Sequence, residues 1–325
     1  MSETILVCGG AGYIGSHTVA ALLERGQNVV VADNLETGHR EAVWDGAKLR
    51  VGDLRDPDFI DTVMREEQPD AVIDFAAYSL VGESVQKPLK YYGNNVTGTI
   101  NLLNAMIYRG VGRLVFSSTA AVYGMPREIP LPETAPTEPI NPYGESKLAV
   151  EKMLRWTGAA HGIKCASLRY FNAAGAHVSG KIGENHNPET HLIPNIVSAA
   201  IRDEEVTVFG GDYNTKDGTC VRDYIHVTDL ADAHILALDA LKTGGSTVYN
   251  LGNGHGFTNL EILKAAERVI GKKIRYRIGP RRPGDPDTLV ASSDQIMKAL
   301  NWRPRYSSLE DIIRTAWVWG RNMMQ

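Results

Sequence analysis

Cysteine is scarce in this sequence, and long apolar runs are missing. The 325 residues include three cysteines, Cys8, Cys165 and Cys220, which lie far apart and form no CxxC pair. We expect buried free thiols in a reducing compartment, with no disulfide and no metal site. No run approaches the roughly 18 apolar residues of a membrane span. The N-terminus lacks the cationic and apolar regions of a signal peptide, so we expect a cytoplasmic protein with no membrane partner.

Neither acidic nor basic residues are in large excess in the sequence. The chain is 43% hydrophobic and 22% charged, and its net charge is −4. Basic and acidic residues are spread evenly along it, which gives no indication of nucleic acid as a partner. This composition is typical of a globular protein long enough to bury a large core.

Short apolar segments alternate with amphipathic ones in the first half of the chain. Strands are predicted at 5–8, 28–33, 48–53, 71–77, 113–118 and 165–172, and helices at 12–25, 56–67, 94–109 and 143–160. This alternation predicts a Rossmann-type, doubly wound parallel sheet with helices on both faces. We assign residues 1–175 to an NAD-binding domain of this α/β fold.

The residue composition of the chain changes after Phe171. Residues 172–191 are polar and rich in Gly, Pro and His, which is typical of a long functional loop. Short mixed segments follow, and an amphipathic helix is predicted near 308–321. We therefore expect a smaller, mixed α/β substrate domain at 176–325, with residues 221–245 as a segment that could return to the first domain.

A glycine-rich turn, "CGGAGYIG", joins the first predicted strand to the first helix. Gly10, Gly12 and Gly15 satisfy GxGxxG, and Gly9, Gly12 and Gly15 equally satisfy GxxGxxG. Glycine in this context lets the backbone approach a pyrophosphate held at the helix N-terminus. Tight packing between strand and helix would also require small residues, but the strand–turn–helix context favours dinucleotide binding.

Two aspartates follow later strands of the same region. Asp33 ends the second strand, where a carboxylate accepts hydrogen bonds from ribose hydroxyls and repels a 2′-phosphate. This favours NAD over NADP, although His39 and Arg40 lie close enough in sequence to serve a phosphate. Asp53 has two open interpretations, as an acceptor for the adenine amino group or as the cap of the next helix.

A tyrosine and a lysine, Tyr143 and Lys147, stand four residues apart in "NPYGESK". On a helix they share one face, so both can reach the same site. A free phenol has a pKa near 10, and lowering it by about three units takes roughly 4 kcal/mol of differential interaction. We expect the Lys147 ammonium and a positive nicotinamide to supply it. Thr119, in "FSSTAAVYG", could relay the proton. The alternative to a catalytic role is that the tyrosine and the lysine occur four residues apart by chance on an exposed helix.

Together the glycine loop, Asp33, "GDLRD", "FSSTAAVYG" and the Tyr–Lys pair resemble the extended short-chain dehydrogenase/reductase family. Within it, "LVGESVQKPLKYY", "LRYFNAAGAH", "THLIP", "DGTCVRDYIHVTDLA" and "PRRPGD" resemble the UDP-glucose 4-epimerases nearly end to end. The resemblance implies an NAD-dependent epimerase that interconverts UDP-glucose and UDP-galactose. Tyr143 would take the O4 proton while the C4 hydride moves to NAD, and the 4-keto sugar would turn and receive the hydride on its other face.

The same resemblance implies which residues contact each ligand. Beside Gly9, Gly12, Gly15 and the catalytic Thr119, Tyr143 and Lys147, the implied cofactor residues are Tyr13, Ile14, Asp33, Asn34, Asp53, Leu54, Phe75, Ala76, Ala77, Ser79, Asn94 and Phe171. The implied UDP-sugar residues are Asn172, His191, Leu192, Phe209, Arg222, Tyr224, Arg282 and Asp285, with Arg281 an equally good candidate beside Arg282.

Several positions depart from the family pattern. Thr119 replaces a common serine but keeps the hydroxyl, and Ser79 replaces a lysine found in some members. Leu289 stands where enzymes confined to UDP-glucose and UDP-galactose often have tyrosine, so N-acetylated sugars could be admitted. Ala120 and Ala121 replace the Asp-Glu pair of nucleotide-sugar 4,6-dehydratases, and decarboxylases carry a glutamate at the second position, so both activities are disfavoured.

Two other functions share the fold. A dehydrogenase that releases NADH is one, and a dinucleotide sensor without turnover is the other; relatives of the second kind usually lose the tyrosine or the lysine. The resemblance also implies a homodimer in which the helices near 94–109 and 143–160 form a four-helix interface. Packing within one subunit would explain the apolar positions of these helices equally well.

Overall fold

A seven-stranded parallel sheet forms the larger part of the structure, a computed structural model that describes residues 2–282 and 284–324. Its strand order is β10-β6-β5-β4-β1-β2-β3. The strands are β1 (Thr4–Cys8), β2 (Asn28–Asp33), β3 (Lys48–Val51), β4 (Ala71–Asp74), β5 (Arg113–Ser117), β6 (Lys164–Tyr170) and β10 (Thr247–Leu251). The predicted doubly wound parallel sheet is confirmed.

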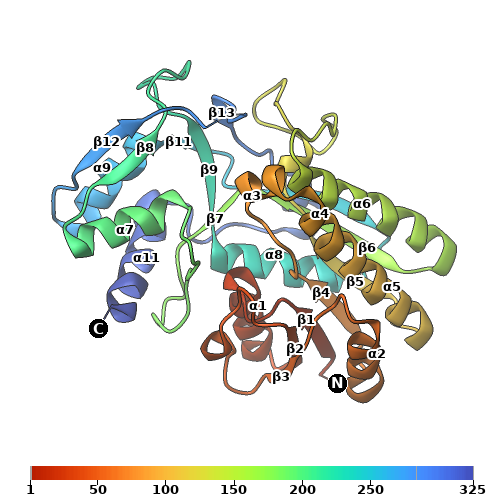
Figure 1. The fold of residues 1–325 in the computed structure, drawn as a ribbon. Coiled ribbons are helices and arrows are strands. Elements are labelled where there is room, and N and C mark those ends of the chain that lie inside the picture. The colour runs from red at the N-terminus through yellow and green to blue at the C-terminus, as the bar shows by residue number, and fades with distance from the viewer. Residues whose placement is uncertain (1, 283, 325) are drawn as a thin grey trace.

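Helices cover both faces of this sheet (Figure 1). On one face lie α1 (Tyr13–Glu24), α8 (Val227–Ala240) and α10 (Asp294–Leu300), and on the other lie α2 (Pro57–Glu67), α5 (Thr97–Arg109) and α6 (Pro142–His161). Alternate residues of β1 supply the two cores, because Ile5 and Val7 pack with α1 and α8 whereas Leu6 and Cys8 pack with α2 and α5. This alternation follows from the period-2 geometry of a strand buried on both sides.

Short helices connect β4 to α5. They are α3 (Val81–Gln86), α4 (Pro88–Tyr91) and a π-helical turn, η2 (Tyr92–Val96), which runs directly into α5. Two 3₁₀ turns, η1 (Arg40–Ala42) and η3 (Ala120–Val122), follow β2 and β5. π-helical turns occur often at functional sites, and this one carries Asn94, a residue implied in cofactor binding.

A smaller group of strands and helices lies beside the large sheet (Figure 1). In it β9 (Val221–His226) pairs with β7 (Asn172–Ala174) and β13 (Thr288–Leu289) in parallel, and with β11 (Gly256–Thr258) antiparallel. A second pair joins β8 (Val206–Phe209) to β12 (Tyr276–Gly279). The helices α7 (Leu192–Arg202), α9 (Asn259–Ile270) and α11 (Leu309–Met323) enclose a separate apolar core.

The chain crosses between the two groups more than once. β7 and β9 belong to the smaller group, whereas α8 packs against α1 and β10 forms an edge of the large sheet. The three cysteines are free and buried. Among the described residues, no helix combines the length and apolar character that crossing a membrane requires.

Candidate active site

A cavity of about 500 Å³ opens at the carboxyl ends of the parallel strands, between the large sheet and the smaller group. This edge is where ligands bind in open α/β sheets. Most sequence-predicted site residues line it. They are Gly9, Gly12, Tyr13, Ile14, Gly15, Asp33, Asn34, Asp53, Leu54, Phe75, Ala76, Ala77, Ser79, Asn94, Thr119, Tyr143, Lys147, Phe171, Asn172, His191, Arg222, Asp285 and Leu289.

Four predicted substrate residues lie outside the lining of this cavity. Leu192 and Tyr224 line a small adjoining cavity together with Asn172 and His191. The Arg282 guanidinium lies 4.4 Å from the centre of the Phe209 ring, and among the described residues its hydrogen bond is to the Thr190 carbonyl, at 3.5 Å. Arg281, by contrast, pairs with Asp212 at 2.8 Å and with Asp287 at 3.3 Å. Of the two arginines, Arg282 is therefore the more available to a ligand.

The glycine turn is shaped by close backbone contacts. A Cβ on Gly15 would lie 2.2 Å from the Gly9 carbonyl oxygen, and Gly9 has a φ of +72° and abuts the Ala76 backbone. Gly12 caps α1 without a side-chain hydrogen bond, and the first turn of α1 carries no acidic residue. The first N–H groups of a helix have no acceptor within it, so those of α1 remain available to an anion in the cavity. The turn therefore fits a dinucleotide pyrophosphate. Gly9 and Gly15 are also required for close packing of the backbone, because a Cβ on either would clash with it.

Asp33 organises the loop beside this turn. Its two carboxylate oxygens accept the backbone N–H groups of Ala11 and Leu35 at 2.9 and 2.8 Å. Burial raises the pKa of Asp33, and these two hydrogen bonds oppose the rise. The carboxylate thus holds its position at the cavity wall, with lone pairs left for ribose hydroxyls.

Glu36 is a second carboxylate at this wall, and the sequence analysis missed it. It accepts a hydrogen bond from the Tyr78 hydroxyl at 2.6 Å. His39 and Arg40 are absent from the cavity lining, and His39 instead contacts the Asn185 carbonyl at 2.8 Å. Arg55 pairs with Glu36 at 3.4 Å, but neither His39 nor Arg40 lines the cavity. The two carboxylates at this wall oppose a 2′-phosphate, so the wall suits NAD better than NADP.

The alternative role of Asp53 as a helix cap is wrong. Asp56 caps α2, accepting from the backbone N–H groups of Asp58 and Phe59 at 3.0 and 3.4 Å. Asp53 lies instead at the cavity, where Arg55 contacts it at 2.6 Å and the Asn34 amide donates to it at 2.8 Å. The Arg55 hydrogen bond holds the pKa of Asp53 well below its usual range, although partial burial opposes this. Asp53 is therefore a charged hydrogen-bond acceptor at the cavity wall, and its contact with adenine stays a prediction.

Tyr143, Thr119 and Lys147 meet at one wall of the cavity. Asn141 caps α6 through the Gly144 N–H at 2.9 Å, and Pro142 occupies the first helical position, so Tyr143 lies in the first turn. Lys147 follows one turn later and is 2% exposed, and its Nζ donates to the Ser117 carbonyl at 2.7 Å. The Thr119 hydroxyl accepts the Ala121 N–H at 3.1 Å and is hydrogen-bonded to Tyr143.

The expectation of a lowered phenol pKa is wrong for the protein alone. Burial raises the pKa of Tyr143, and only the hydrogen bond with Thr119 opposes this. The Lys147 ammonium is directed at the Ser117 carbonyl, and burial lowers its pKa to about 8, against the attraction of Asp74 and Glu151. A phenolate at neutral pH would therefore need a further positive charge in the cavity, such as an oxidised nicotinamide.

Asp74 lies behind Lys147 at the end of β4. It is 1% exposed; one oxygen accepts the Ala76 N–H at 3.0 Å, and Oδ2 has no hydrogen-bond partner among the described residues. Burial raises the pKa of Asp74 to about 6, although Lys147 pulls it down. The two groups are thus coupled, because the negative charge of Asp74 raises the pKa of Lys147 and opposes the lowering that burial of the lysine causes.

We expect Asp74→Asn to change the pH dependence of stability. A carboxyl whose pKa is raised on folding stabilises the protein below its unfolded pKa of 3.8, and this contribution is lost as pH rises through about 6. The variant should therefore gain stability relative to the wild type over that window, by up to roughly 3 kcal/mol. Urea unfolding of both proteins between pH 4.5 and 7 measures the difference. A difference that stays constant with pH would contradict the assignment.

The opposite wall carries cationic and polar groups from the smaller group of strands. Arg222 donates from Nη1 to the carbonyls of Val221 and Pro286 at 2.8 and 2.9 Å. Its buried Nη2 makes no hydrogen bond among the described residues, and a carboxylate oxygen of Asp285 lies 3.5 Å from it. A guanidinium nitrogen beside a cavity that has only this longer ion pair can still donate to a phosphate oxygen. Arg222 therefore has the chemistry expected for a diphosphate.

Sequence reasoning also missed aromatic and histidine side chains of the lining. They are Tyr78, Tyr170 and His186. Tyr170 immediately precedes the predicted Phe171, and Tyr78 lies between the predicted Ala77 and Ser79, so position at a strand end was the available signal. His186 lies in the polar loop, where no local pattern marks one residue above its neighbours.

Comparisons with known proteins agree with this geometry. Residues 5–252 match the model of the NAD dependent epimerase/dehydratase family. The UDP-glucose 4-epimerase of Lactobacillus helveticus is 56% identical, over 98% of this chain and 97% of its own length. The structure of UDP-glucose 4-epimerase from Brucella ovis in complex with NAD superposes with a TM-score of 0.94 at 46% identity, over 98% of this chain and 99% of that one. The structure of the UDP-Glc/GlcNAc 4-epimerase from Campylobacter jejuni superposes with a TM-score of 0.86 at 41% identity, over 99% of this chain and 100% of that one. This chain belongs to the NAD dependent epimerase/dehydratase family.

Proposed function

We propose that this chain interconverts UDP-glucose and UDP-galactose by epimerisation at C4, with NAD as its resident cofactor. The observation that carries the proposal is the meeting of Tyr143, Thr119 and Lys147 in one cavity with the glycine turn. The similarity to UDP-glucose 4-epimerases over nearly the whole chain supports the same substrates.

In this reaction the chain itself moves and holds protons. Tyr143, linked to Thr119, takes the proton from the sugar O4 and returns it after the 4-keto sugar has turned. Lys147, fixed by the Ser117 carbonyl, keeps a positive charge beside the phenol and the cofactor. Bound NAD supplies the acceptor that stores the C4 hydride and gives it back. Arg222 holds the diphosphate, which leaves the sugar free to turn.

The direct test is to denature the purified protein and identify released NAD, then to follow conversion of UDP-galactose without added cofactor. We expect about one NAD per chain and turnover without a net NADH signal. Steady NADH formation would indicate an ordinary dehydrogenase instead. A 4,6-dehydratase is opposed by Ala120 and Ala121, which line the cavity with methyl groups that cannot transfer protons.

Leu289 gives a prediction about substrate range. It lines the cavity and packs against the cluster of Val122, Tyr123 and Leu148. We expect it to leave room for an acetamido group, so that UDP-N-acetylglucosamine is turned over at a rate comparable to that of UDP-glucose. In Leu289→Tyr the larger side chain should reduce turnover of the N-acetylated sugar more than that of UDP-galactose. Competition between the two sugars measures this ratio, and complete refusal of UDP-N-acetylglucosamine by the wild type would contradict the prediction.

We also infer a homodimer through a four-helix interface of α5 and α6. These neighbouring helices expose large apolar side chains, with Ile100 41%, Tyr108 77% and Trp156 68% exposed. Exposed large apolar side chains on neighbouring helices favour an interaction surface. Light scattering of the purified protein tests this, and a monomeric mass at micromolar concentration would contradict it.

The remaining expectations concern the domains and the compartment. We propose an NAD-binding domain of residues 1–175 that takes back part of 221–245, and a UDP-sugar domain over the remainder of 176–325. The packing of α8 on α1 supports the return of that segment. The buried free thiols support a reducing, cytoplasmic location. Limited proteolysis and cell fractionation test the two proposals.

A further inference from the structure

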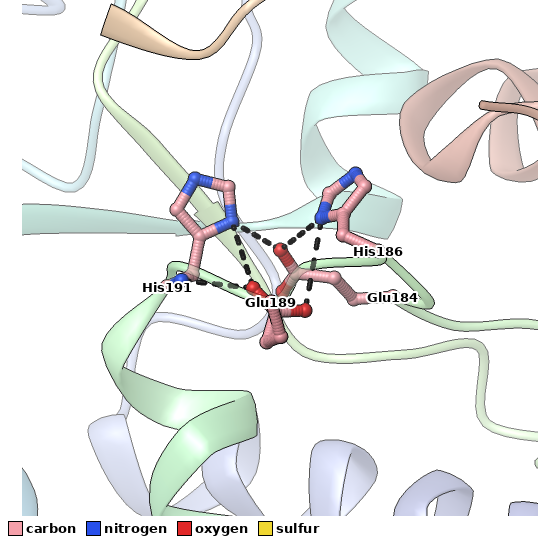
Figure 2. A group of neighbouring side chains, drawn as sticks. All are labelled: Glu184, His186, Glu189 and His191. Carbon is pink, nitrogen blue, oxygen red and sulfur yellow. Dashed lines mark hydrogen bonds and ion pairs between the residues drawn. The ribbon is translucent and has the colours of Figure 1, made fainter. Parts of the chain in front are cut away.

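Two histidines and two glutamates gather in the loop that precedes α7, as Figure 2 shows. Each of the four residues offers one potential metal-ligand atom, an imidazole nitrogen or a carboxylate oxygen, and these four atoms all lie within 4.8 Å of one another. The residues are Glu184, His186, Glu189 and His191. The sequence analysis expected no metal site because it considered only the cysteines. His191 is also one of the implied UDP-sugar residues, but none of the four side chains takes part in the proposed proton transfer.

The two imidazoles direct the same kind of atom at the same pair of carboxylates. Nδ1 of His186 lies 3.1 Å from Glu184 and 3.7 Å from Glu189. Nδ1 of His191 contacts Glu184 and lies 3.7 Å from Glu189. Ligands at about 2.0–2.1 Å from a tetrahedral zinc ion are roughly 3.3 Å from one another. Three of these separations, 3.1, 3.7 and 3.7 Å, lie close to this value, whereas His191 and Glu184 are nearer and would have to move apart for an ion to enter.

The backbone that carries these side chains is fixed. The Trp319 indole donates to the Glu184 carbonyl at 2.8 Å, and His39 holds the Asn185 carbonyl at 2.8 Å. The Glu189 carboxylate accepts the N–H groups of Thr190 and His191 at 2.7 and 2.8 Å. The side chain of Glu184 is only 5% exposed, and buried charges in proteins are either paired or bound to metals. The four groups are therefore preorganised before any ion arrives.

We propose that Glu184, His186, Glu189 and His191 form a binding site for one divalent transition-metal ion of the zinc class. Two imidazoles and two carboxylates suit Zn²⁺ and its neighbours better than Mg²⁺ or Ca²⁺, which prefer oxygen alone. The two carboxylates match the charge of a divalent ion. Four protein ligands close the coordination sphere of zinc, as in structural sites. The ion fixes residues 184–191, whose His186 and His191 form part of the cavity wall.

The experiment measures metal content, so its outcome is independent of epimerase activity. The full-length protein with its cofactor is stripped with EDTA, dialysed against Zn²⁺, and assayed by inductively coupled plasma mass spectrometry. We expect about one Zn²⁺ per chain, and no such binding when Mg²⁺ replaces zinc. Co²⁺ at the same site should give the visible absorption of a four-coordinate ion.

Variants locate the site. His186→Gln and Glu189→Gln should each lower Zn²⁺ affinity by at least about 100-fold, because even outer-shell changes cost 10–100-fold. His255→Gln is the matched control, since His255 is exposed and lies outside the cluster. Glu189→Gln keeps an acceptor for the two backbone N–H groups; if it fails to fold, His186→Gln alone decides. Substoichiometric zinc, or equal binding by the cluster and control variants, would overturn the proposal in favour of a plain ion-pair network.

Discussion

Replacing Tyr143 by phenylalanine should lower turnover of UDP-galactose by about 10²–10⁴-fold, the usual contribution of a positioned acid–base group. The phenol lines the cavity in hydrogen-bonded contact with Thr119. Phenylalanine keeps the ring and the packing of the first turn of α6. Bound NAD should therefore remain at about one per chain while the proton transfer is lost. Stopped assays of UDP-galactose conversion, with NAD released by denaturation, measure both quantities.

Tyr170→Phe is the matched control for this experiment. Tyr170 also presents a phenol to the cavity, but its hydroxyl is hydrogen-bonded to Ser117, and burial raises its pKa well above the usual value of a phenol. Its removal should change turnover far less than the Tyr143 substitution. Equal losses in the two variants would show that the cavity needs phenols for packing. Unchanged turnover in Tyr143→Phe would refute the proton path outright.

The sequence predicts the large sheet well because its signals are local. β1, β2, β4, β5 and β6 carry runs of apolar residues buried on both faces, and Asn28–Asp33 is recovered residue for residue. β10 was missed as a strand of this sheet because it lies beyond α8, and nothing within "TVYNL" says which sheet it joins. Pairing between distant segments is decided by tertiary packing, which no local pattern records.

The candidate site likewise has some features that local sequence spacing predicts and others that depend on contacts between distant segments. The glycine turn, Asp33 and the Tyr–Lys pair are recognisable because spacing along one element fixes their geometry. The direction of Lys147 Nζ was not predictable, because it depends on the Ser117 carbonyl at the end of β5. The roles of Asp53 and Asp56 were likewise separable only once the first turn of α2 was seen. The cluster of Glu184, His186, Glu189 and His191 depends on a loop whose path is set by contacts with α11 and His39.

Lys147→Met should reduce both turnover and retention of NAD. The ammonium is buried, donates to Ser117, and lies within electrostatic reach of Asp74 and Glu151. Methionine fills a similar volume but removes the buried positive charge that we propose serves the phenol and the cofactor. We expect turnover to fall by at least about 100-fold. The amount of NAD left after desalting, measured by chromatography of the denatured protein, should fall below one per chain.

Loss of the lysine also changes its buried neighbour. Lys147 lowers the pKa of Asp74, so in Lys147→Met that carboxyl should titrate above about 6 and stay largely protonated closer to neutral pH. The double variant Lys147→Met/Asp74→Asn separates the two contributions, because it removes both charges and leaves the cavity shape. If the lysine acts only by balancing Asp74, the double variant should recover NAD retention and turnover. If its charge serves the phenol and the cofactor, as we propose, stability should recover and turnover should not.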